Sequence, residues 1–375
     1  MKSNSILYDD AIFRSKWHGG ICRYFRELLR GLAHDATFTT TVLSFSGEAL
    51  NRELPARFEQ LPSSSPLRGS GYLGSIGKSI NRHRENVVLC NYWSKHKPGV
   101  YHSTIYRAAP GLQLPEVCTL YDMIPEKHDE FRDERTKQWL KQKHDCMSRS
   151  EIILSISETS KAEAVSMLSI EPQKIKVVHL GCSDFFFCDD NIHPIPVSYA
   201  NFPFMLFVGE RRGYKNFQLL LSALAESNDL GEMHLVAVGS SWFEEEISLI
   251  ERLGIGHRVH LCSTPSDEML RHLYHKAAAF IFPSLEEGFG LPLLEAMACG
   301  CPVVASDIPC FREIGGELPL YFSANDPDAL AKACVAAMNR PRSSFLHEYR
   351  VHAKQFSWRK TVQQTANAYL EVASC

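Results

Sequence analysis

Short apolar runs alternate with longer amphipathic segments along most of the chain, and the pattern is most regular between residues 204 and 338. The apolar runs in this part are typical of buried strands and lie at residues 204–208, 234–238, 259–262, 279–282, 303–305 and 320–322. Segments with helical spacing separate most of these runs. Strands that alternate with helices predict a parallel, doubly wound sheet, so we expect an α/β domain here.

The first half of the chain shows the same alternation less regularly. Strands are expected at residues 6–8, 39–45, 87–89, 100–101, 117–120, 151–156 and 175–179. Residues 21–32 carry their apolar side chains on one helical stripe, which predicts an amphipathic helix after the first strand. Residues 46–86 are rich in Pro, Ser and Gly, and we expect a long loop there with a short helix near 76–84.

A change of composition at residues 188–203 separates the two halves. This segment has three prolines and no periodicity, which is typical of a linker. We therefore predict an N-terminal domain at residues 1–190 and a C-terminal domain at residues 200–355. Residues 356–375 are amphipathic and predict a terminal helix. A length of 375 residues fits two domains better than one hydrophobic core.

Charge and cysteine content narrow the class of protein. The net charge of −3 offers no case for a nucleic-acid-binding protein. The twelve cysteines form no CxxC pair, which favours reduced thiols in the cytoplasm over a disulfide scaffold. We find no signal-peptide pattern and no apolar stretch of transmembrane length, so we expect a cytoplasmic protein. Basic and apolar residues at 68–84 favour either a solvated loop or peripheral contact with the inner face of the membrane.

The most informative stretch is residues 283–300, which reads PSLEEGFGLPLLEAMACG and follows an apolar run. A glycine-rich turn before a helix presents free backbone N–H groups, which suit phosphate. Glu287 lies in the loop and Glu295 about one turn inside the helix, so one acid could hold sugar hydroxyls and the other a ribose. The alternative is an ordinary helix start with charged residues. The residues at this turn that we expect to contact the donor are Gly288, Phe289, Gly290 and Leu291.

This string resembles the nucleotide-sugar signature of the retaining glycosyltransferase family 4, whose E-x7-E motif is matched by Glu287 and Glu295. The resemblance runs from Gly19 to the terminal helix and is most specific at residues 207–217 and 283–316. It implies the GT-B fold: two Rossmann-like, doubly wound parallel-sheet domains facing a cleft. In that fold the N-terminal domain binds the acceptor, the C-terminal domain binds the nucleotide sugar, and the terminal helix crosses back to the N-terminal domain.

A second motif, FVGERRGYKN at residues 207–216, places cations after an apolar strand. Fixed cations near a leaving diphosphate would stabilise its developing charge. The family carries an Arg/Lys pair at this place, and Lys215 matches its lysine. Arg211 is our choice for the arginine, with Arg212 as the competitor. Such a pair can replace a metal ion, and the chain has no suitable Asp-x-Asp motif, so we predict a metal-independent enzyme without a cofactor.

Further donor contacts follow from the resemblance. Gly19 and Gly20 precede the first amphipathic helix, where the family places a glycine loop near the donor phosphates. Gly239 ends the strand at 234–238, beside the expected position of the nucleotide base. A Gly-Gly pair alone is a weak signal, because many loops contain one.

Acceptor residues are expected in the motifs YHSTIYR (101–107) and LYDMIPE (120–126). Many family members have His-Asp where this chain has Tyr121 and Asp122. We expect Asp122, with Tyr121 and His102, to contact the acceptor, and we include Asp122 among the catalytic residues beside Arg211, Lys215 and Glu287. A structural role for His102 is the alternative.

The motifs HSTIYR, YDMIPE and GYKNF look most like bacterial mannosyltransferase-like members that build O-antigen. The resemblance therefore implies a hexosyltransferase that moves mannose from GDP-mannose to a saccharide acceptor, expected to be lipid-linked. It also implies retention by reaction on one face of the sugar, with Glu287 positioning the donor. The alternatives are a UDP- or dTDP-sugar donor, a nucleotide-sugar epimerase of the same fold, and a non-catalytic sugar-binding protein.

Overall fold

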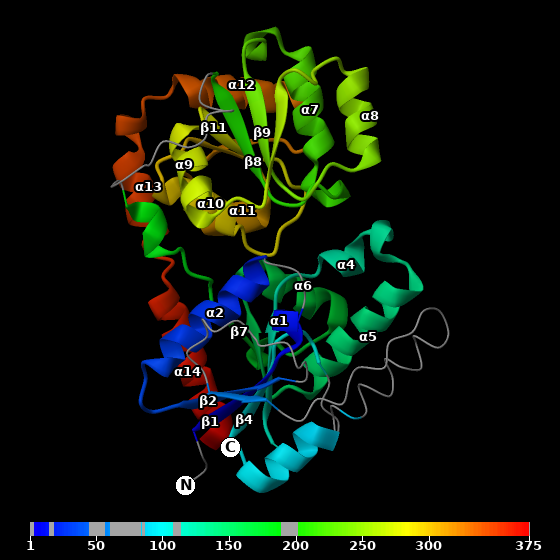
Figure 1. Cartoon of the computed structure of the whole chain (residues 1–375), viewed down its shortest axis with the longest axis vertical. Coiled ribbons are helices and arrows are strands. Elements are labelled where there is room, and N and C mark those ends of the chain that lie inside the picture. The colour runs from blue at the N-terminus through cyan, green and yellow to red at the C-terminus, as the bar shows by residue number, and fades with distance from the viewer. Residues whose placement is uncertain are drawn as a thin grey trace. The chain divides into compact units, whose positions relative to one another are not determined.

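A computed structural model describes residues 4–14, 19–44, 57–60, 84, 87–107, 114–188 and 202–374 of the chain. The chain divides into two compact units (Figure 1). The first unit contains residues 1–180 and 358–375, and the second unit contains residues 181–357. The helix expected near 76–84 and the lipid-facing surface considered at 68–84 lie outside the described residues, apart from residue 84.

The first unit is built on a seven-stranded sheet with the order β3-β2-β1-β4-β5-β6-β7. All of these strands pair in parallel. The chain reverses its direction across the sheet between β1 and β4, which creates a switch point. The strands are β1 (Ser5–Asp9), β2 (Thr39–Ser44), β3 (Arg57–Gln60), β4 (Val100–Ser103), β5 (Glu116–Leu120), β6 (Ile152–Ser155) and β7 (Ile175–Val177).

Helix α2 buries the apolar stripe that its sequence predicts and packs beside α14 (Figure 1). Gly31 lies where the two helices approach closely, because a Cβ at this position would collide with Val362 of α14. The amphipathic C-terminal segment therefore packs in the first unit. The helices of this unit are α1 (Ala11–Arg14), α2 (Gly20–Ala33), α4 (Ile124–Lys127), α5 (Glu134–Arg149), α6 (Glu158–Leu168) and α14 (Trp358–Ser374).

Residues 87–96 are helical, so the strand expected at 87–89 is wrong. The β-branched Val87 and Val88 favour a strand by propensity. In the fold, Leu89 and Tyr92 lie about one helical turn apart, and both are buried in a core cluster with side chains of β1, β2 and β4. Only helical spacing places these two residues on one face, so tertiary packing outweighs local propensity here.

The second unit has a six-stranded parallel sheet with the order β10-β9-β8-β11-β12-β13. The six strands predicted from the apolar runs are confirmed. The direction of the chain across this sheet reverses between β8 and β11. The strands are β8 (Phe204–Val208), β9 (His234–Gly239), β10 (Val259–Ser263), β11 (Ala279–Phe282), β12 (Val303–Ser306) and β13 (Leu320–Phe322).

Helices cover both faces of this second sheet. Ala279 and Ile281 of β11 pack in a core cluster with apolar residues of α7, α8 and α12. Phe280, which points to the opposite face, packs against Tyr274 of α9 instead. The helices are α7 (Phe217–Glu226), α8 (Glu244–Arg252), α9 (Asp267–Lys276), α10 (Leu291–Ala298), α11 (Pro309–Gly315), α12 (Pro327–Asn339) and α13 (Leu346–Ala353). Within the described residues, none of the helices has the length and apolar character needed to cross a membrane.

Candidate functional site

The two motifs singled out in the second half of the chain meet at the switch point of the second sheet. β8 ends at Val208 and β11 ends at Phe282, and these neighbouring parallel strands deliver their loops at the same edge. In open α/β sheets, ligands bind at the carboxyl ends of the strands beside such a reversal. The fold therefore brings residues 209–216 and 283–290 to the place where a ligand is expected.

Lys215 and Glu287 form an ion pair at this edge. The Lys215 Nζ lies 2.6 Å from the Glu287 Oε1, and the hydroxyl of Ser284 donates to the same oxygen at 2.8 Å. The backbone N–H of Leu285 donates to the carbonyl of Tyr214 at 2.8 Å, which ties the two loops together. Both charged side chains are largely buried, at 15% exposure for Lys215 and 10% for Glu287. The loops thus hold a cation and a carboxylate in one fixed arrangement.

Arg211 is held rigidly beside this pair of loops. Its Nε donates to Glu246 Oε1 at 2.8 Å, and its Nη2 donates to the carbonyls of Ser240 and Ser241 at 2.9 Å each. The guanidinium also stacks on the ring of Trp242, 4.6 Å from its centroid. Its Nη1 is buried and makes no hydrogen bond to any residue that the structure describes. A buried donor without a partner is costly. The Arg211 side chain has no exposed surface, so its expected contact with the diphosphate remains a prediction.

Arg212 differs from Arg211 in its environment. Its side chain is 42% exposed and pairs with Glu210 at 2.8 Å. An exposed side chain of this kind is held less firmly than a buried one. The structure thus holds Arg211 more firmly than Arg212, and which of the two contacts the diphosphate remains a prediction.

Gly239 is required by close packing rather than by a turn. A Cβ at this position would lie 2.5 Å from the Gly209 carbonyl oxygen and 2.6 Å from the Arg211 Nη1. The end of β9 therefore approaches the guanidinium directly, which places Gly239 at the same edge as Arg211.

The glycine-rich turn leads into α10 as the sequence predicts. Gly290 has a φ of 113°, a left-handed value that favours glycine, and it serves as the N-cap with no capping side chain. The first backbone N–H groups of α10 are thus not satisfied by a side-chain cap. Phe289 is buried, and its carbonyl accepts a hydrogen bond from the Cys310 thiol. Gly288 completes the turn before it, and Leu291 begins the helix.

Glu295 lies deeper than its expected ribose contact requires. Glu295 is only 5% exposed. Its Oε2 accepts a hydrogen bond from the Tyr274 hydroxyl at 3.2 Å. Burial, and then the negative charge of Glu295, raise the pKa of Tyr274 well above its usual value, so this hydroxyl remains a donor. A ribose contact would have to share the carboxylate with Tyr274, and this role remains a prediction.

His102 does not fit the acceptor contact that we expected. It lies on β4 with no exposed surface, and its Nδ1 and Nε2 lie 2.5 Å from the Tyr369 hydroxyl and 2.9 Å from the Thr119 hydroxyl. Burial lowers the pKa of His102 to about 3, so its ring is neutral at physiological pH. Both ring nitrogens are engaged inside the first unit, which makes His102 a structural residue.

Tyr121 also turns into the interior. Its side chain is buried, and its hydroxyl donates to the carbonyl of Thr104 at 2.8 Å. The expected acceptor contact of the Tyr121 side chain is therefore not supported. Asp122, by contrast, is partly exposed at the end of β5, and its Oδ1 accepts the backbone N–H of Ile124 at 3.1 Å. Of the three acceptor residues, only Asp122 presents its side chain at the surface of the first unit.

Gly19 and Gly20 begin α2, after the carboxyl end of β1. Gly19 is exposed and is the N-cap residue, and no side chain caps the helix. A Cβ on Gly19 would have no atom within 4 Å, so close packing does not explain why glycine is found there. Both glycines belong to the first unit, whereas the other predicted donor residues belong to the second.

Two residues at the site escaped the sequence analysis. Glu246 looked like one of several acids in the first turn of α8, yet it is buried and bonded to Arg211. Ser284 precedes Glu287 by three residues in the motif. A serine at this spacing within a turn often forms a local hydrogen bond, so the sequence could have predicted its contact with Glu287.

The chain is similar in sequence to known glycosyltransferases. Residues 189–355 match the family model described as glycosyl transferases group 1. The chain is 28% identical over 377 residues to the O-antigen chain mannosyltransferase B of Escherichia coli, covering 93% of this chain and 95% of that protein. It is also 36% identical over 149 residues to the serotype-specific mannosyltransferase WbdA of Escherichia coli, which is 38% of this chain and 18% of that one.

Solved structures show the same fold. HepE from Anabaena, crystallised in complex with UDP and glucose, matches with a TM-score of 0.76 at 18% identity, over 98% of this chain and 99% of that one. The sheet order of each unit and this match both fit two Rossmann-like units. The chain therefore carries a group 1 glycosyltransferase domain at residues 189–355 and has the GT-B fold.

Proposed function

We propose that the chain transfers mannose from GDP-mannose to a lipid-linked saccharide acceptor in bacterial O-antigen synthesis, with retention and without a metal ion. The observation that carries the proposal is the similarity to the O-antigen chain mannosyltransferase B, which spans 93% of this chain. The local geometry supports the same reading, because cations and a carboxylate are held at the carboxyl edge of the second sheet.

The second unit would bind the donor. Lys215 and the Nη1 of Arg211 would hold the diphosphate, and the start of α10 would add backbone N–H groups. Glu287, fixed by Ser284, would accept hydrogen bonds from the sugar hydroxyls. Glu295 would contact the ribose.

The proposed reaction proceeds on one face of the sugar. The bond between the anomeric carbon and the β-phosphate oxygen breaks as the acceptor hydroxyl oxygen bonds to the same carbon. The hydroxyl proton passes to the leaving phosphate oxygen, so GDP and the glycosylated acceptor are the products. Lys215 and Arg211 stabilise the negative charge that develops on the phosphate, a contribution worth about 100- to 1,000-fold in rate for one well-placed donor. Asp122 of the first unit would accept a hydrogen bond from the acceptor hydroxyl.

A UDP-sugar donor is the second candidate. The observation in its favour is the structural match to HepE, whose structure holds UDP and glucose. At 18% identity this match shows the fold alone. The sequence similarity to mannosyltransferases supports a mannose donor, and GDP-mannose is the donor that we propose.

A thermal-shift panel separates these candidates. The chain is heated with GDP, UDP, ADP or dTDP and with their sugars, and GDP and GDP-mannose are expected to stabilise the second unit. Stabilisation by UDP alone would replace the donor in the proposal, and no stabilisation by any nucleotide would favour a non-catalytic protein.

A transfer assay then tests the chemistry. GDP-mannose and a synthetic mannoside with an alkyl chain are incubated with the protein in EDTA, and the anomeric configuration of the product is read by NMR. We expect an α-linked product at an undiminished rate. Loss of activity that magnesium or manganese restores would refute metal independence, and conversion of the donor without an acceptor would indicate an epimerase.

A further inference from the structure

We propose that Lys143 is a positioning residue that fixes Asp122 for acceptor binding by holding the backbone carbonyl of Asp122. The inference rests on the proposed function, because it assumes that Asp122 contacts the acceptor. It concerns a residue of α5 that has no exposed surface and therefore touches no substrate.

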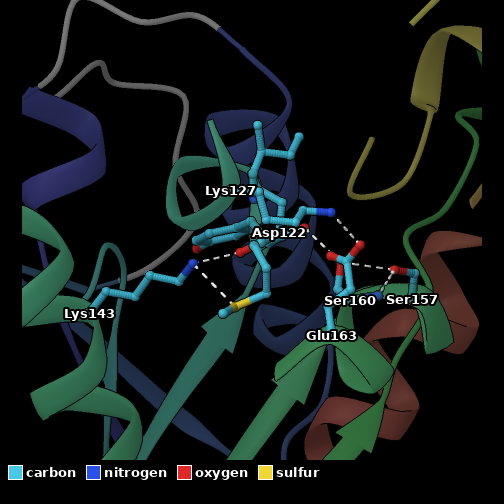
Figure 2. A network of polar contacts seen from close by, with 9 residues as sticks. Asp122, Lys127, Lys143, Ser157, Ser160 and Glu163 are labelled. Carbon is cyan, nitrogen blue, oxygen red and sulfur yellow. Dashed lines mark hydrogen bonds and ion pairs between the residues drawn. The ribbon is translucent and has the colours of Figure 1, made fainter. Parts of the chain in front are cut away.

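The ammonium group of Lys143 is fully used by the turn that carries Asp122. Its Nζ donates to the Asp122 carbonyl at 2.6 Å and lies 3.5 Å from the Met123 sulfur (Figure 2). The same Nζ lies 2.8 Å from the Glu126 Oε1. A lysine has three N–H donors, and three acceptors surround it here. All three acceptors belong to residues 122–126. The Lys143 side chain therefore contacts both ends of the turn that follows β5.

Glu126 supplies the opposite charge for this buried cation. Its side chain is 6% exposed, and the same Oε1 also accepts a hydrogen bond from the His144 Nε2 at 3.1 Å. Burial alone would raise the pKa of Glu126, but the hydrogen bond from His144 and the charge and hydrogen bond of Lys143 outweigh burial and lower it. Glu126 is therefore a carboxylate at neutral pH, and the buried cation has a charged partner.

Helix α6 holds the same turn from its other side. The Ser160 hydroxyl donates to the Tyr121 carbonyl at 3.3 Å, and Ser157 caps α6 by accepting the Ser160 N–H (Figure 2). Lys127 pairs with Glu163 at 2.6 Å. The carbonyls of Tyr121 and Asp122 are thus bonded to side chains of two different helices, α6 and α5.

The use of a charge at this place points to positioning rather than to stability. Burying an ion pair costs desolvation energy, and apolar side chains of similar size often stabilise a protein as well or better. A methionine in place of Lys143 would fill the same space but could not donate to the Asp122 carbonyl. What the ammonium supplies, and an apolar residue does not, is a fixed direction for that carbonyl and hence for the carboxylate attached to the same residue.

The test removes both charges together, because Lys143→Met alone leaves Glu126 buried without its cation. We expect the double variant Lys143→Met/Glu126→Gln to fold, with an unchanged donor KM, an unchanged Kd for GDP, and a kcat at least tenfold lower. The matched control is Lys137→Met/Glu134→Gln, which removes an exposed ion pair from the same helix at 2.6 Å. The control is expected to match the wild type in every readout.

A double-mutant cycle with Asp122→Ala separates an effect on the position of Asp122 from a general loss of structure. In an Asp122→Ala background, the Lys143→Met/Glu126→Gln change is expected to lower kcat by less than twofold, because the group that it positions is already absent. A full tenfold loss in that background, or an unchanged kcat in the Asp122 protein, would overturn the proposal.

Hydrogen–deuterium exchange gives a readout that does not depend on activity. Backbone amides of residues 121–127 are expected to exchange faster in the Lys143→Met/Glu126→Gln variant and to be unchanged in the control. Equal exchange in this segment would refute the anchoring itself. Faster exchange together with a wild type that transfers no sugar from any donor would refute only the proposed function.

Discussion

The buried ring of His102 offers a quantitative test of the interior of the first unit. Its two nitrogens pair with the hydroxyls of Tyr369 on α14 and Thr119 on β5, and Tyr369 in turn pairs with the Tyr8 hydroxyl at 2.8 Å. Burial lowers the pKa of His102 from 6.5 to about 3, so the folded unit keeps the ring neutral. In the unfolded chain the ring binds a proton near pH 6.5, which favours unfolding at lower pH.

The size of the effect follows from linkage. A group with a lower pKa in the folded state stabilises the fold above its unfolded pKa, and this contribution is lost as the pH falls through 6.5 toward the folded value. Between pH 7.5 and pH 5, His102 should lower the free energy of unfolding by about 2 kcal/mol. Because pH 5 lies well above the folded pKa, the unfolded pKa sets almost all of this loss.

The assay compares the wild type with His102→Gln, whose amide can still hydrogen-bond but cannot titrate. Urea unfolding is followed by tryptophan fluorescence in a Trp242→Phe background, since the other tryptophans belong to the first unit. The change removes a buried partner, so His102→Gln should cost about 1–3 kcal/mol at pH 7.5. At pH 5 the difference between the two proteins should shrink by about 2 kcal/mol. A difference that is the same at both pH values would refute the buried, neutral state of His102.

Further predictions concern the donor side. Lys215→Ala should lower kcat by about 100-fold or more, because it removes a cation that stabilises the leaving phosphate. The affinity for the acceptor should stay unchanged. An unchanged kcat in steady-state kinetics would refute this role of Lys215. Glu246→Gln should weaken GDP binding measured by calorimetry at least fivefold, because Arg211 loses the negative charge of the partner that orients it. Glu244→Gln, an acid in the same first turn of α8 that does not contact Arg211, is the control. Equal affinities for the two glutamate variants would show that Glu246 does not act through Arg211.

Local patterns carried much of the architecture. The apolar runs of the second half correspond to β8–β13, because strands buried on both faces need continuous apolar segments. The turn at Gly288–Gly290 and the start of α10 were readable for a similar reason, since Gly290 needs a left-handed φ and the helix start tolerates Pro292. The cations after β8 were also found, because they follow an apolar strand and a glycine.

Other features depended on contacts between distant parts of the chain. Residues 87–96 form a helix although the β-branched residues at its start favour a strand. The helix places Leu89 and Tyr92 in one core cluster. The sequence predicted that His102 and Tyr121 follow strand ends, where exposure was expected. His102 instead lies within β4, and both side chains are buried against partners on other elements.

The charged residues of the site could be found from local sequence, but their partners depend on long-range contacts. The two motifs and the family resemblance identified Lys215, Glu287 and Arg211 as candidates. Nothing in their spacing revealed that Lys215 pairs with Glu287, 72 residues away. Likewise, Lys143 looks like any charged residue of an amphipathic helix until the fold surrounds it with the Asp122–Glu126 turn. Periodicity reports which face of an element is buried, whereas the partner of a buried charge is set by which elements the topology brings together.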